Sequence, residues 1–206
     1  MLVGNRMTKD PITVEPGDLL SRASHKMQAG GFRRLPVVSD AKLVGIVTER
    51  DLREHGGHLE HMKVNGVMTE SPFTVTPETT LEEAAGIMLE QQIGGLPVVH
   101  DDRLVGIITA SDIMRAFLDV MGASNGGSTR IDFVLEGEEH GFIEASRIVA
   151  REGAEVLGVG TYRKKFDENP VCYLRLVTSN SDKVAKALRV SGFRVLGVHK
   201  IGAEPK

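Results

Sequence analysis

The sequence predicts an α+β protein in which a duplicated β-α-β-β-α unit is followed by a separate βαββαβ domain. Three observations lead to this prediction. Motifs in the first half of the chain recur at a constant offset of 61 residues, beginning with Met7 and Met68. Within each copy, apolar residues follow helical and then strand periodicity. After Phe117 the repeat stops, and a stretch rich in glycine and serine leads into a new pattern.

The duplication needs no gap to align its two copies. Each copy carries the same short motifs in the same order, which is the sign of an internal repeat. The matched motifs are Met7-Thr8 with Met68-Thr69, Pro11 with Pro72, Thr13-Val14 with Thr74-Val75, Leu35-Pro36-Val37-Val38 with Leu96-Pro97-Val98-Val99, Leu43-Val44-Gly45-Ile46 with Leu104-Val105-Gly106-Ile107, and Thr48 and Asp51 with Thr109 and Asp112.

Each copy contains an extended segment, a helix, two strands and a second helix. In the first copy the extended segment covers residues 12–14, and Asp18 is the expected N-cap of the first helix. Strands at 35–38 and 43–47 follow, and the second helix begins after Thr48. The second copy places its strands at 96–99 and 104–108. The expected buried stripes of the first helices are Leu20, Ala23 and Met27 in one copy and Leu81, Ala84, Ala85 and Met88 in the other.

The composition is that of a folded protein with an aliphatic core. Of its 206 residues 41% are hydrophobic and 26% are charged, and the net charge is −3. This balance gives no domain-wide basic face, so nucleic acid is not an expected partner. No apolar run reaches the length of a membrane span, and the first residues lack the apolar stretch of a signal peptide. The single Cys172 excludes an intramolecular disulfide, so we expect a cytoplasmic location.

The repeated motifs resemble the CBS domain, whose members occur as tandem pairs. The resemblance covers residues 3 to about 118. It implies that residues 1–62 and 63–121 are two CBS repeats that form one module. It also implies that this module binds an adenine nucleotide or a related adenosyl ligand in its cleft, with AMP, ADP, ATP, NAD and S-adenosylmethionine as candidates. No cofactor is required for this role.

The chemistry of each copy is concentrated where its second strand meets its second helix. A helix N-terminus offers unpaired N–H groups and a positive dipole end, both of which suit a phosphate. The resemblance implies that Thr48 and Thr109 donate to a phosphate, and that Asp51 and Asp112 accept hydrogen bonds from ribose hydroxyls. The spacing Thr-x-x-Asp is also that of a capping box, an ordinary helix start. Spacing alone leaves both interpretations open.

Basic residues distinguish the first copy from the second. Arg33 and Arg34 precede the first Leu-Pro-Val-Val strand, whereas the matching positions are Gly94 and Gly95. The resemblance to nucleotide-binding CBS pairs implies that basic residues at this point face the phosphates, because a guanidinium matches phosphate geometry. The alternative interpretation of Arg33 and Arg34 is a solvated turn. Arg50 is a further candidate. The resemblance places the base against Val14 and Pro36, with Leu35, or against Val75 and Pro97, with Leu96.

Residues 53–61, between the repeats, contain three histidines and two glutamates, which are residue types that bind zinc or nickel. The pair Gly56-Gly57 prevents a rigid helical array of these side chains, and solvated linkers commonly carry such residues. We therefore predict a solvated linker and no metal site.

Residues 122–129 have the composition of a linker, and residues 130–206 form the last domain. Strands are expected at 130–136, 155–162, 171–178 and 193–200, with helices at 140–152 and after the cap residue Ser181. This order is ferredoxin-like and resembles an ACT domain over residues 128–199. The loop Glu138-Glu139-His140-Gly141 lacks the proline that is usual in ACT ligand loops, so amino-acid binding and dimerisation both stay open. Phe142, Ala145, Ile148 and Val149 are expected to point inward.

The combined pattern predicts a regulatory protein. A CBS pair followed by an ACT domain resembles bacterial acetoin-utilisation accessory proteins. The expected partners are an adenine nucleotide, a second copy in a homodimer, and a regulated enzyme or transporter. Catalysis is not predicted, because the sequence has no Walker loop and Cys172 lies in an apolar strand. The alternatives are a scaffold that dimerises without ligand and an amino-acid sensor.

Overall fold

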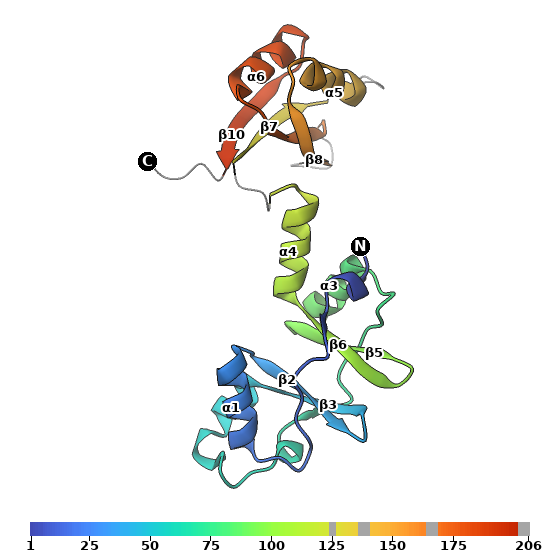
Figure 1. Cartoon of the computed structure of the whole chain (residues 1–206), viewed down its shortest axis with the longest axis vertical. Coiled ribbons are helices and arrows are strands. Elements are labelled where there is room, and N and C mark those ends of the chain that lie inside the picture. The colour runs from blue at the N-terminus through green and yellow to red at the C-terminus, as the bar shows by residue number, and fades with distance from the viewer. Residues whose placement is uncertain (124–126, 136–140, 164–168, 202–206) are drawn as a thin grey trace. The chain divides into compact units, whose positions relative to one another are not determined.

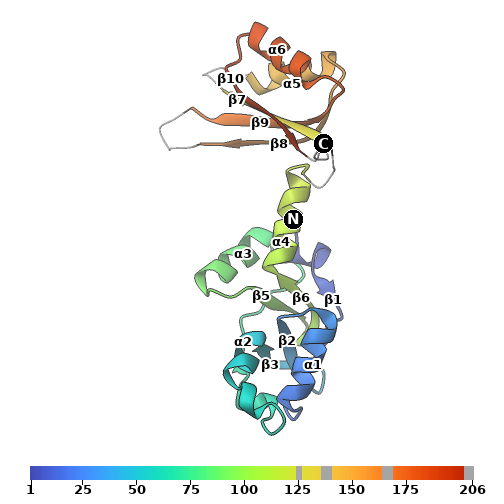
Figure 2. The same cartoon turned by 90° about the vertical axis from the view of Figure 1, so that its left-hand side faces the viewer.

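The computed structural model describes residues 1–123, 127–135, 141–163 and 169–201. The chain divides into two compact units, Met1–Met114 and Arg115–Lys206 (Figures 1 and 2). The division falls within helix α4 (Ala110–Val120), several residues before the predicted linker. No helix within the described ranges is both long and apolar enough to cross a bilayer.

The N-terminal unit contains the two predicted repeats. Each has a two-residue opening strand, a helix, a strand hairpin and a second helix, so the predicted order of helices and paired strands is confirmed. The first repeat consists of β1 (Thr8–Lys9), α1 (Leu20–Gly30), β2 (Arg34–Ser39), β3 (Lys42–Thr48) and α2 (Glu49–Glu54). The second consists of β4 (Thr69–Glu70), α3 (Leu81–Glu90), β5 (Gly95–His100), β6 (Arg103–Thr109) and α4.

The first helix of each repeat buries the face that its periodicity predicted. The buried residues are Leu20, Ala23 and Met27 on α1 and Leu81, Ala84 and Met88 on α3, whereas Ala85, also expected in this stripe, is only partly buried. The predicted cap of α1 is wrong. Its N-cap is Leu19, without a side-chain hydrogen bond. Asp18 instead accepts from the backbone N–H of Glu15 at 3.0 Å and pairs with Arg22 at 2.8 Å. The acid therefore stabilises the preceding turn rather than the helix end.

The opening strand of each repeat pairs with the other repeat. β1 lies antiparallel to β6, with Thr8 opposite Ile107, and β4 lies antiparallel to β3, with Thr69 opposite Ile46. The two hairpins also meet directly, where Lys42 pairs with Arg103. The strands of both repeats therefore form one six-stranded sheet, in which the opening strand of each repeat is paired with the other repeat. The two repeats therefore form a single structural unit.

The glycine of each repeated Leu-Val-Gly-Ile motif makes room for this exchange. A β-carbon on Gly106 would lie 2.5 Å from the sulfur of Met7 and 3.0 Å from the carbonyl oxygen of Thr8. A β-carbon on Gly45 would lie 2.7 Å from the sulfur of Met68 and meet Thr69 in the same way. The Met-Thr motif and the glycine motif are thus two sides of one contact, which explains why both recur.

The C-terminal unit has the predicted element order. It contains β7 (Ser128–Val134), α5 (Gly141–Arg151), β8 (Glu155–Tyr162), β9 (Val171–Val177), α6 (Ser181–Val190) and β10 (Val195–Ile201). The strands form an antiparallel sheet in the order β10-β7-β9-β8. Figures 1 and 2 show α5 and α6 together on one face of this sheet. The core is aliphatic around Phe133: Ile131, Ala145, Ile148, Val149, Cys172, Leu174, Leu176, Val184, Ala185 and Leu188.

Two details of this unit differ from the prediction. Phe142, expected to point inward, is 40% exposed on the first turn of α5. The N-cap of α6 is Asn180 rather than Ser181, because the Asn180 side chain accepts from the N–H of Lys183 at 3.0 Å. Ser181 is the first helical residue and is buried. Glu136, the first three residues of the loop 138–141 and linker residues 124–126 lie outside the described residues.

Candidate functional site

The first strand-to-helix junction joins β3 to α2 and is held by two side chains. Oδ2 of Asp51 accepts from the backbone N–H of Thr48 at 2.7 Å and from its hydroxyl at 2.8 Å. The Thr48 hydroxyl in turn accepts from the backbone N–H of Asp51. This is a complete capping box.

The second junction, from β6 to α4, repeats the two hydrogen bonds that the aspartate accepts. Oδ2 of Asp112 accepts from the N–H of Thr109 at 2.9 Å and from its hydroxyl at 2.6 Å. Both aspartates are half-buried. Because each threonine hydroxyl donates its proton to the aspartate, it holds the carboxylate in place rather than offering that proton to a phosphate.

The cap leaves part of the first carboxylate open to a ligand. Oδ1 of Asp51 accepts no hydrogen bond from any described residue. One oxygen thus anchors the side chain, while the other can accept hydrogen bonds from hydroxyl groups. The capping interpretation and the ligand-binding interpretation are therefore compatible, since they use different oxygens of one carboxylate.

The predicted base-contact residues lie beside one another in each repeat. The N–H of Val14 donates to the carbonyl of Pro36 at 3.1 Å, and Val75 donates to Pro97 at 3.2 Å. Each valine also forms a parallel bridge with its repeat's Leu-Pro-Val-Val strand, at Val37 in the first case. Pro36 and Pro97 belong to strands β2 and β5. Val14 and Val75 each add a single-residue bridge to the strand beside them.

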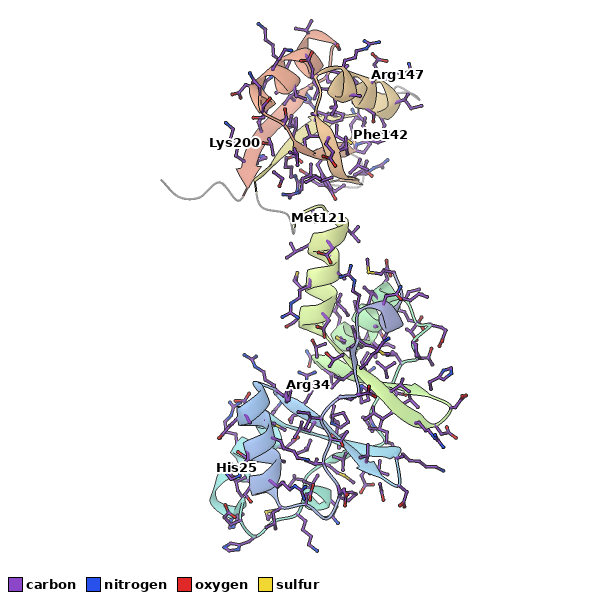
Figure 3. The ribbon with its side chains drawn as sticks, in the orientation of Figure 1. His25, Arg34, Met121, Phe142, Arg147 and Lys200 are labelled. Carbon is purple, nitrogen blue, oxygen red and sulfur yellow. The ribbon has the colours of Figure 1, made fainter. Side chains whose placement is uncertain are left out.

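The three predicted arginines occupy different environments. Arg33 is exposed, and Arg50 is 83% exposed and pairs with Glu54 at 3.1 Å on α2. Arg34, at the start of β2, is half-buried (Figure 3). Burial, and then the like charge of Arg33, lower the pKa of the Arg34 guanidinium. No described residue forms a hydrogen bond or ion pair with the Arg34 guanidinium.

Arg34 crosses from its own repeat to the other. A β-carbon on Gly94 would lie 2.7 Å from Nη2 of Arg34, and one on Gly95 would lie 2.5 Å from Nη1. Arg34 is opposite Thr48 in the β2–β3 ladder, and Gly95 is opposite Thr109 in the β5–β6 ladder. The guanidinium thus starts beside one junction and ends beside the other. Sequence comparison of the repeats showed the Arg/Gly difference but not this contact.

Two hollows are found away from these junctions. One of about 390 Å³ in the N-terminal unit includes Val75 among its lining residues. It also contains Glu83, Asp101 and Asp102, whose charges disfavour an anionic ligand. The other, of about 450 Å³, lies at the start of α6 and is lined by Ser128, Thr129, Thr178, Ser179, Asn180, Ser181, Asp182 and Lys200, with Gly127.

The histidine segment and the cysteine show neither a metal-binding cluster nor an activated thiol among the described residues. Among the described residues, no group of three or more His, Cys, Asp or Glu side chains is arranged to hold a metal ion. Cys172 is fully buried, and burial, followed by the charge of Asp132, raises the pKa of its thiol to about 11. The thiol is therefore protonated at neutral pH, and a protonated, buried thiol is a poor nucleophile.

The C-terminal unit contains an ionic cluster around a buried aspartate that the sequence analysis missed. Asp132 is 5% exposed and binds Arg130 through both carboxylate oxygens, with a shortest distance of 2.7 Å. The Arg130 guanidinium lies 4.4 Å from the ring centre of Tyr173, and His199 lies 3.4 Å from Asp132. The alternation of Arg130 and Asp132 along β7 places both on one face, which is the signal that could have indicated the pair.

The comparisons with known proteins concern the N-terminal half. The CBS domain model matches residues 3–57 and 64–119, more than half of the chain. The chain belongs to the CBS domain family. The two matches coincide with the two repeats, and the second ends within α4.

Solved CBS-pair structures match this region with TM-scores above one half. CBSX2 of Arabidopsis thaliana, crystallised with AMP, is 34% identical, with a TM-score of 0.53, 57% of this chain and 96% of that chain covered. The CBS pair of protein MJ0100, with 5′-methylthioadenosine and S-adenosyl-L-methionine, is 31% identical (TM-score 0.54; 57% and 95% covered). A protein assigned to acetoin utilisation (AcuB) from Vibrio cholerae is 36% identical (TM-score 0.53; 57% and 90% covered).

The chain matches only part of the length of two curated relatives. Inosine-5′-monophosphate dehydrogenase of Korarchaeum cryptofilum is 44% identical over 108 residues, which are 51% of this chain but 22% of that enzyme. The match spans about half of a second relative from Methanocaldococcus jannaschii, at 47%. The likeness to these proteins is thus confined to their CBS region.

Proposed function

We propose that the CBS pair of this chain is a regulatory module that binds an adenosine ligand at its strand-to-helix junctions and is not itself a catalyst. The observation that carries the proposal is Asp51, which is anchored through Oδ2 while its Oδ1 accepts no hydrogen bond from the described residues; Asp112 is anchored through its own Oδ2. The bound ligands named for CBSX2 and MJ0100, AMP and two adenosyl sulfur compounds, support the same ligand class. NAD, ADP and ATP share the adenosine group and are further candidates.

The proposed roles follow from the contacts at each junction. Asp51 and Asp112 accept hydrogen bonds from the ribose hydroxyls, and Thr48 and Thr109 position these carboxylates. Val14 with Pro36, and Val75 with Pro97, provide the apolar surface for the base. Arg34, a half-buried cation without a counter-ion among the described residues, provides charge for a phosphate, with Arg33 and Arg50 as exposed contributors.

Removing either carboxylate should weaken binding at its own junction. We expect Asp51→Ala or Asp112→Ala to cost about 1.5–3 kcal/mol of binding free energy, about a ten- to hundredfold loss of affinity. Calorimetric titration with AMP, ATP and S-adenosylmethionine measures this loss. For the unchanged protein, a ligand at a hundred times its dissociation constant should add about 2.7 kcal/mol to the free energy of unfolding.

Each aspartate also accepts hydrogen bonds from the threonine at the start of its helix, so a matched control is needed. Thr80 caps α3 by accepting from the N–H of Glu83 at 3.2 Å and is remote from both aspartates in sequence. Thr80→Ala should lose a comparable cap stability, about 1 kcal/mol, with ligand affinity unchanged. Unaltered ligand binding in both aspartate variants would contradict the assignment, and phosphate release from ATP would contradict the non-catalytic role.

A homodimer is part of the proposal, and α4 supports it. This helix exposes Met114, Phe117, Leu118 and Val120, with exposed fractions between 42% and 60%. The first three recur at the spacing of one helix face, and such an apolar stripe is typical of a helix that packs against a partner. Light scattering should give twice the chain mass of 22.3 kDa. Phe117→Asp should return the mass to that of one chain; a monomeric unchanged protein would contradict the proposal.

We further propose that the C-terminal unit is ACT-like and responds to the CBS pair or contacts the regulated partner, an enzyme or transporter. Its βαββαβ order, the sheet order β10-β7-β9-β8 and the two helices on one face support this relationship. The likeness to AcuB supports a role connected with acetoin utilisation. The proposal has two forms: in one the C-terminal unit binds an amino acid, and in the other it serves only to dimerise the protein.

A further inference from the structure

The hollow at the start of α6 is walled mainly by polar groups of the C-terminal unit. Its volume of about 450 Å³ is within the usual range of small-molecule sites. The first turn of α6, the residues before it, the beginning of β7 and Lys200 on β10 line it (Figure 3). The hollow therefore lies where β7 begins, whereas the loop to α5 follows the other end of that strand.

Two hydroxyl groups in this lining are buried and lack a partner. Thr129 is 7% exposed and Ser181 is 5% exposed. Neither hydroxyl forms a hydrogen bond with any described residue, and neither oxygen is fully enclosed by protein. A buried hydroxyl without a hydrogen bond is unfavourable. Because both residues line the hollow, a ligand in it can supply the missing partner.

The register of the sheet brings one of these hydroxyls and a cation to the same side. Thr129 lies opposite Leu176 in the β7–β9 ladder and opposite Lys200 in the β7–β10 ladder. Leu176 belongs to the core that the sheet forms with α5 and α6. Thr129 and Lys200 therefore lie on the face that the helices cover. Ser181, the first residue of α6, meets them there.

The start of α6 adds backbone donors. The Asn180 side chain accepts from the N–H of Lys183, and its carbonyl accepts from the N–H of Val184. The N–H groups of Ser181 and Asp182 have no acceptor in the described part of the chain, as is usual in a first helical turn. The ten residues of α6 also place the positive end of the helix dipole here.

A buried guanidinium lies behind the wall of the hollow. Arg175 is 3% exposed and alternates with core residues along β9, so it approaches from the other face of the sheet. Its Nη1 donates to the hydroxyl of Ser128, a wall residue, at 3.2 Å, and its Nε has no partner. No carboxylate of the described ranges pairs with it. A buried cation without a counter-ion favours an anion nearby.

The charges and donors of the hollow fit a phosphate group. Asp182 is the one acidic residue of the described lining, and it is exposed, so water weakens its repulsion of an anion. Lys200 and Arg175 outweigh it. The two hydroxyls, the two free N–H groups and the ammonium are more donors than the roughly four lone-pair sites of a carboxylate accept. The three terminal oxygens of a phosphate group accept them all.

We propose that this hollow binds the phosphate group of a small anion, either free phosphate or a phosphomonoester. The phosphate accepts hydrogen bonds from the hydroxyls of Thr129 and Ser181 and from the N–H groups at the start of α6, and it pairs with Lys200. Arg175 acts through its charge and by holding Ser128. The site is formed wholly by the C-terminal unit, so it does not depend on the function proposed for the CBS pair.

Titrations of the full chain with inorganic phosphate, glycerol 3-phosphate and acetate test the proposal. Calorimetry should show binding of phosphate or of its ester, and the ¹H–¹⁵N signals of Ser181 and Asp182 should shift with the same affinity. Tighter binding of glycerol 3-phosphate identifies a phosphomonoester as the ligand, and equal or tighter binding of inorganic phosphate identifies the free ion. Acetate binding as tightly as both overturns the proposal.

Single hydroxyl deletions test the assigned contacts. Thr129→Val and Ser181→Ala should each weaken binding of the better phosphate probe about ten- to hundredfold, the effect of a hydrogen bond to a charged group. The urea midpoint of the ligand-free C-terminal unit should not fall, because neither hydroxyl has a hydrogen bond to lose. The matched control is Thr161→Val, which removes a hydroxyl of β8 outside the described lining and should leave the affinity unchanged.

The remaining outcomes each contradict the proposal. It falls if neither phosphate probe binds, or if binding leaves the signals of Ser181 and Asp182 in place. It also falls if Thr129→Val and Ser181→Ala bind the probe as tightly as the unchanged protein. Weaker binding together with a lower urea midpoint in both variants assigns the hydroxyls a structural role and overturns the proposal as well. A CBS pair that binds no adenosine ligand leaves it standing.

Discussion

Phe133→Ala is expected to lower the free energy of unfolding of the C-terminal unit by about 3–5 kcal/mol, the usual cost of removing a buried phenylalanine ring. Phe133 is fully buried at the centre of this core. Its ring meets that of Phe193 edge-on at a centroid distance of 5.3 Å. The substitution removes this contact and leaves a cavity between the sheet and the helices.

The chain offers a selective measurement of this loss. It has no tryptophan and two tyrosines, and both Tyr162 and Tyr173 lie in the C-terminal unit. Tyrosine fluorescence during urea unfolding therefore follows this unit alone. Phe142→Ala, at a 40% exposed position on α5, is the matched control and should cost less than half as much. Equal losses in the two variants would contradict the assignment of Phe133 to the core.

Gly106→Ala should destabilise the N-terminal unit by about 1–3 kcal/mol, the usual cost of overpacking. The added methyl group would lie 2.5 Å from the sulfur of Met7 and 3.0 Å from the carbonyl oxygen of Thr8. The sulfur can move, but the carbonyl belongs to β1, which is paired to β6 at this point. Relief of the clash therefore requires the exchanged strand to shift.

The same substitution elsewhere in this unit should have the opposite sign. Gly86 lies within α3 and has open space around its missing side chain. Gly86→Ala should stabilise the helix by about 0.5–1 kcal/mol, because alanine loses less backbone entropy. Far-UV circular dichroism reports the unfolding of both units. The transition that tyrosine fluorescence also reports belongs to the C-terminal unit, so the remaining transition belongs to the N-terminal unit. A neutral or stabilising Gly106→Ala would contradict the close strand contact.

Combining Gly106→Ala with Met7→Ala tests the exchange itself. The double variant removes the sulfur that the new methyl group would meet, so the two losses should not add. Additive losses would mean that the two residues are not in contact. Only the pairing of β1 with β6 brings these residues together, since they lie at opposite ends of the N-terminal unit's sequence.

Local patterns predicted much of the fold because they act over a few residues. The stripe Leu20, Ala23 and Met27 follows helical spacing, and the strands at 35–38 and 96–99 were correctly placed, each one residue shorter at either end than β2 and β5. Local patterns failed where several polar residues compete for one role. Asp18 and Ser181 are both of residue types that favour the N-cap position, yet neither is the N-cap of its helix in the structure.

The candidate site shows the same division. Comparison of the repeats located Thr48, Asp51 and their counterparts, because a duplicated motif is visible without a structure. It could not show that each threonine hydroxyl donates to its aspartate, since Thr-x-x-Asp spacing is compatible with several hydrogen-bond arrangements. The ionic cluster of Arg130 and Asp132 was missed because sequence alternation does not reveal which charges become buried.

The sequence by itself determined the duplication, the order of helices and strands, and the repeated Thr-x-x-Asp motifs, all of which depend on spacing along the chain. Only the tertiary structure decided which repeat receives each opening strand and where Arg34 extends its charge. β1 and β4 are two residues long, too short to carry a periodicity that specifies a partner. Their pairing, and the crossing of Arg34 over Gly94 and Gly95, depend on close packing between segments distant in sequence.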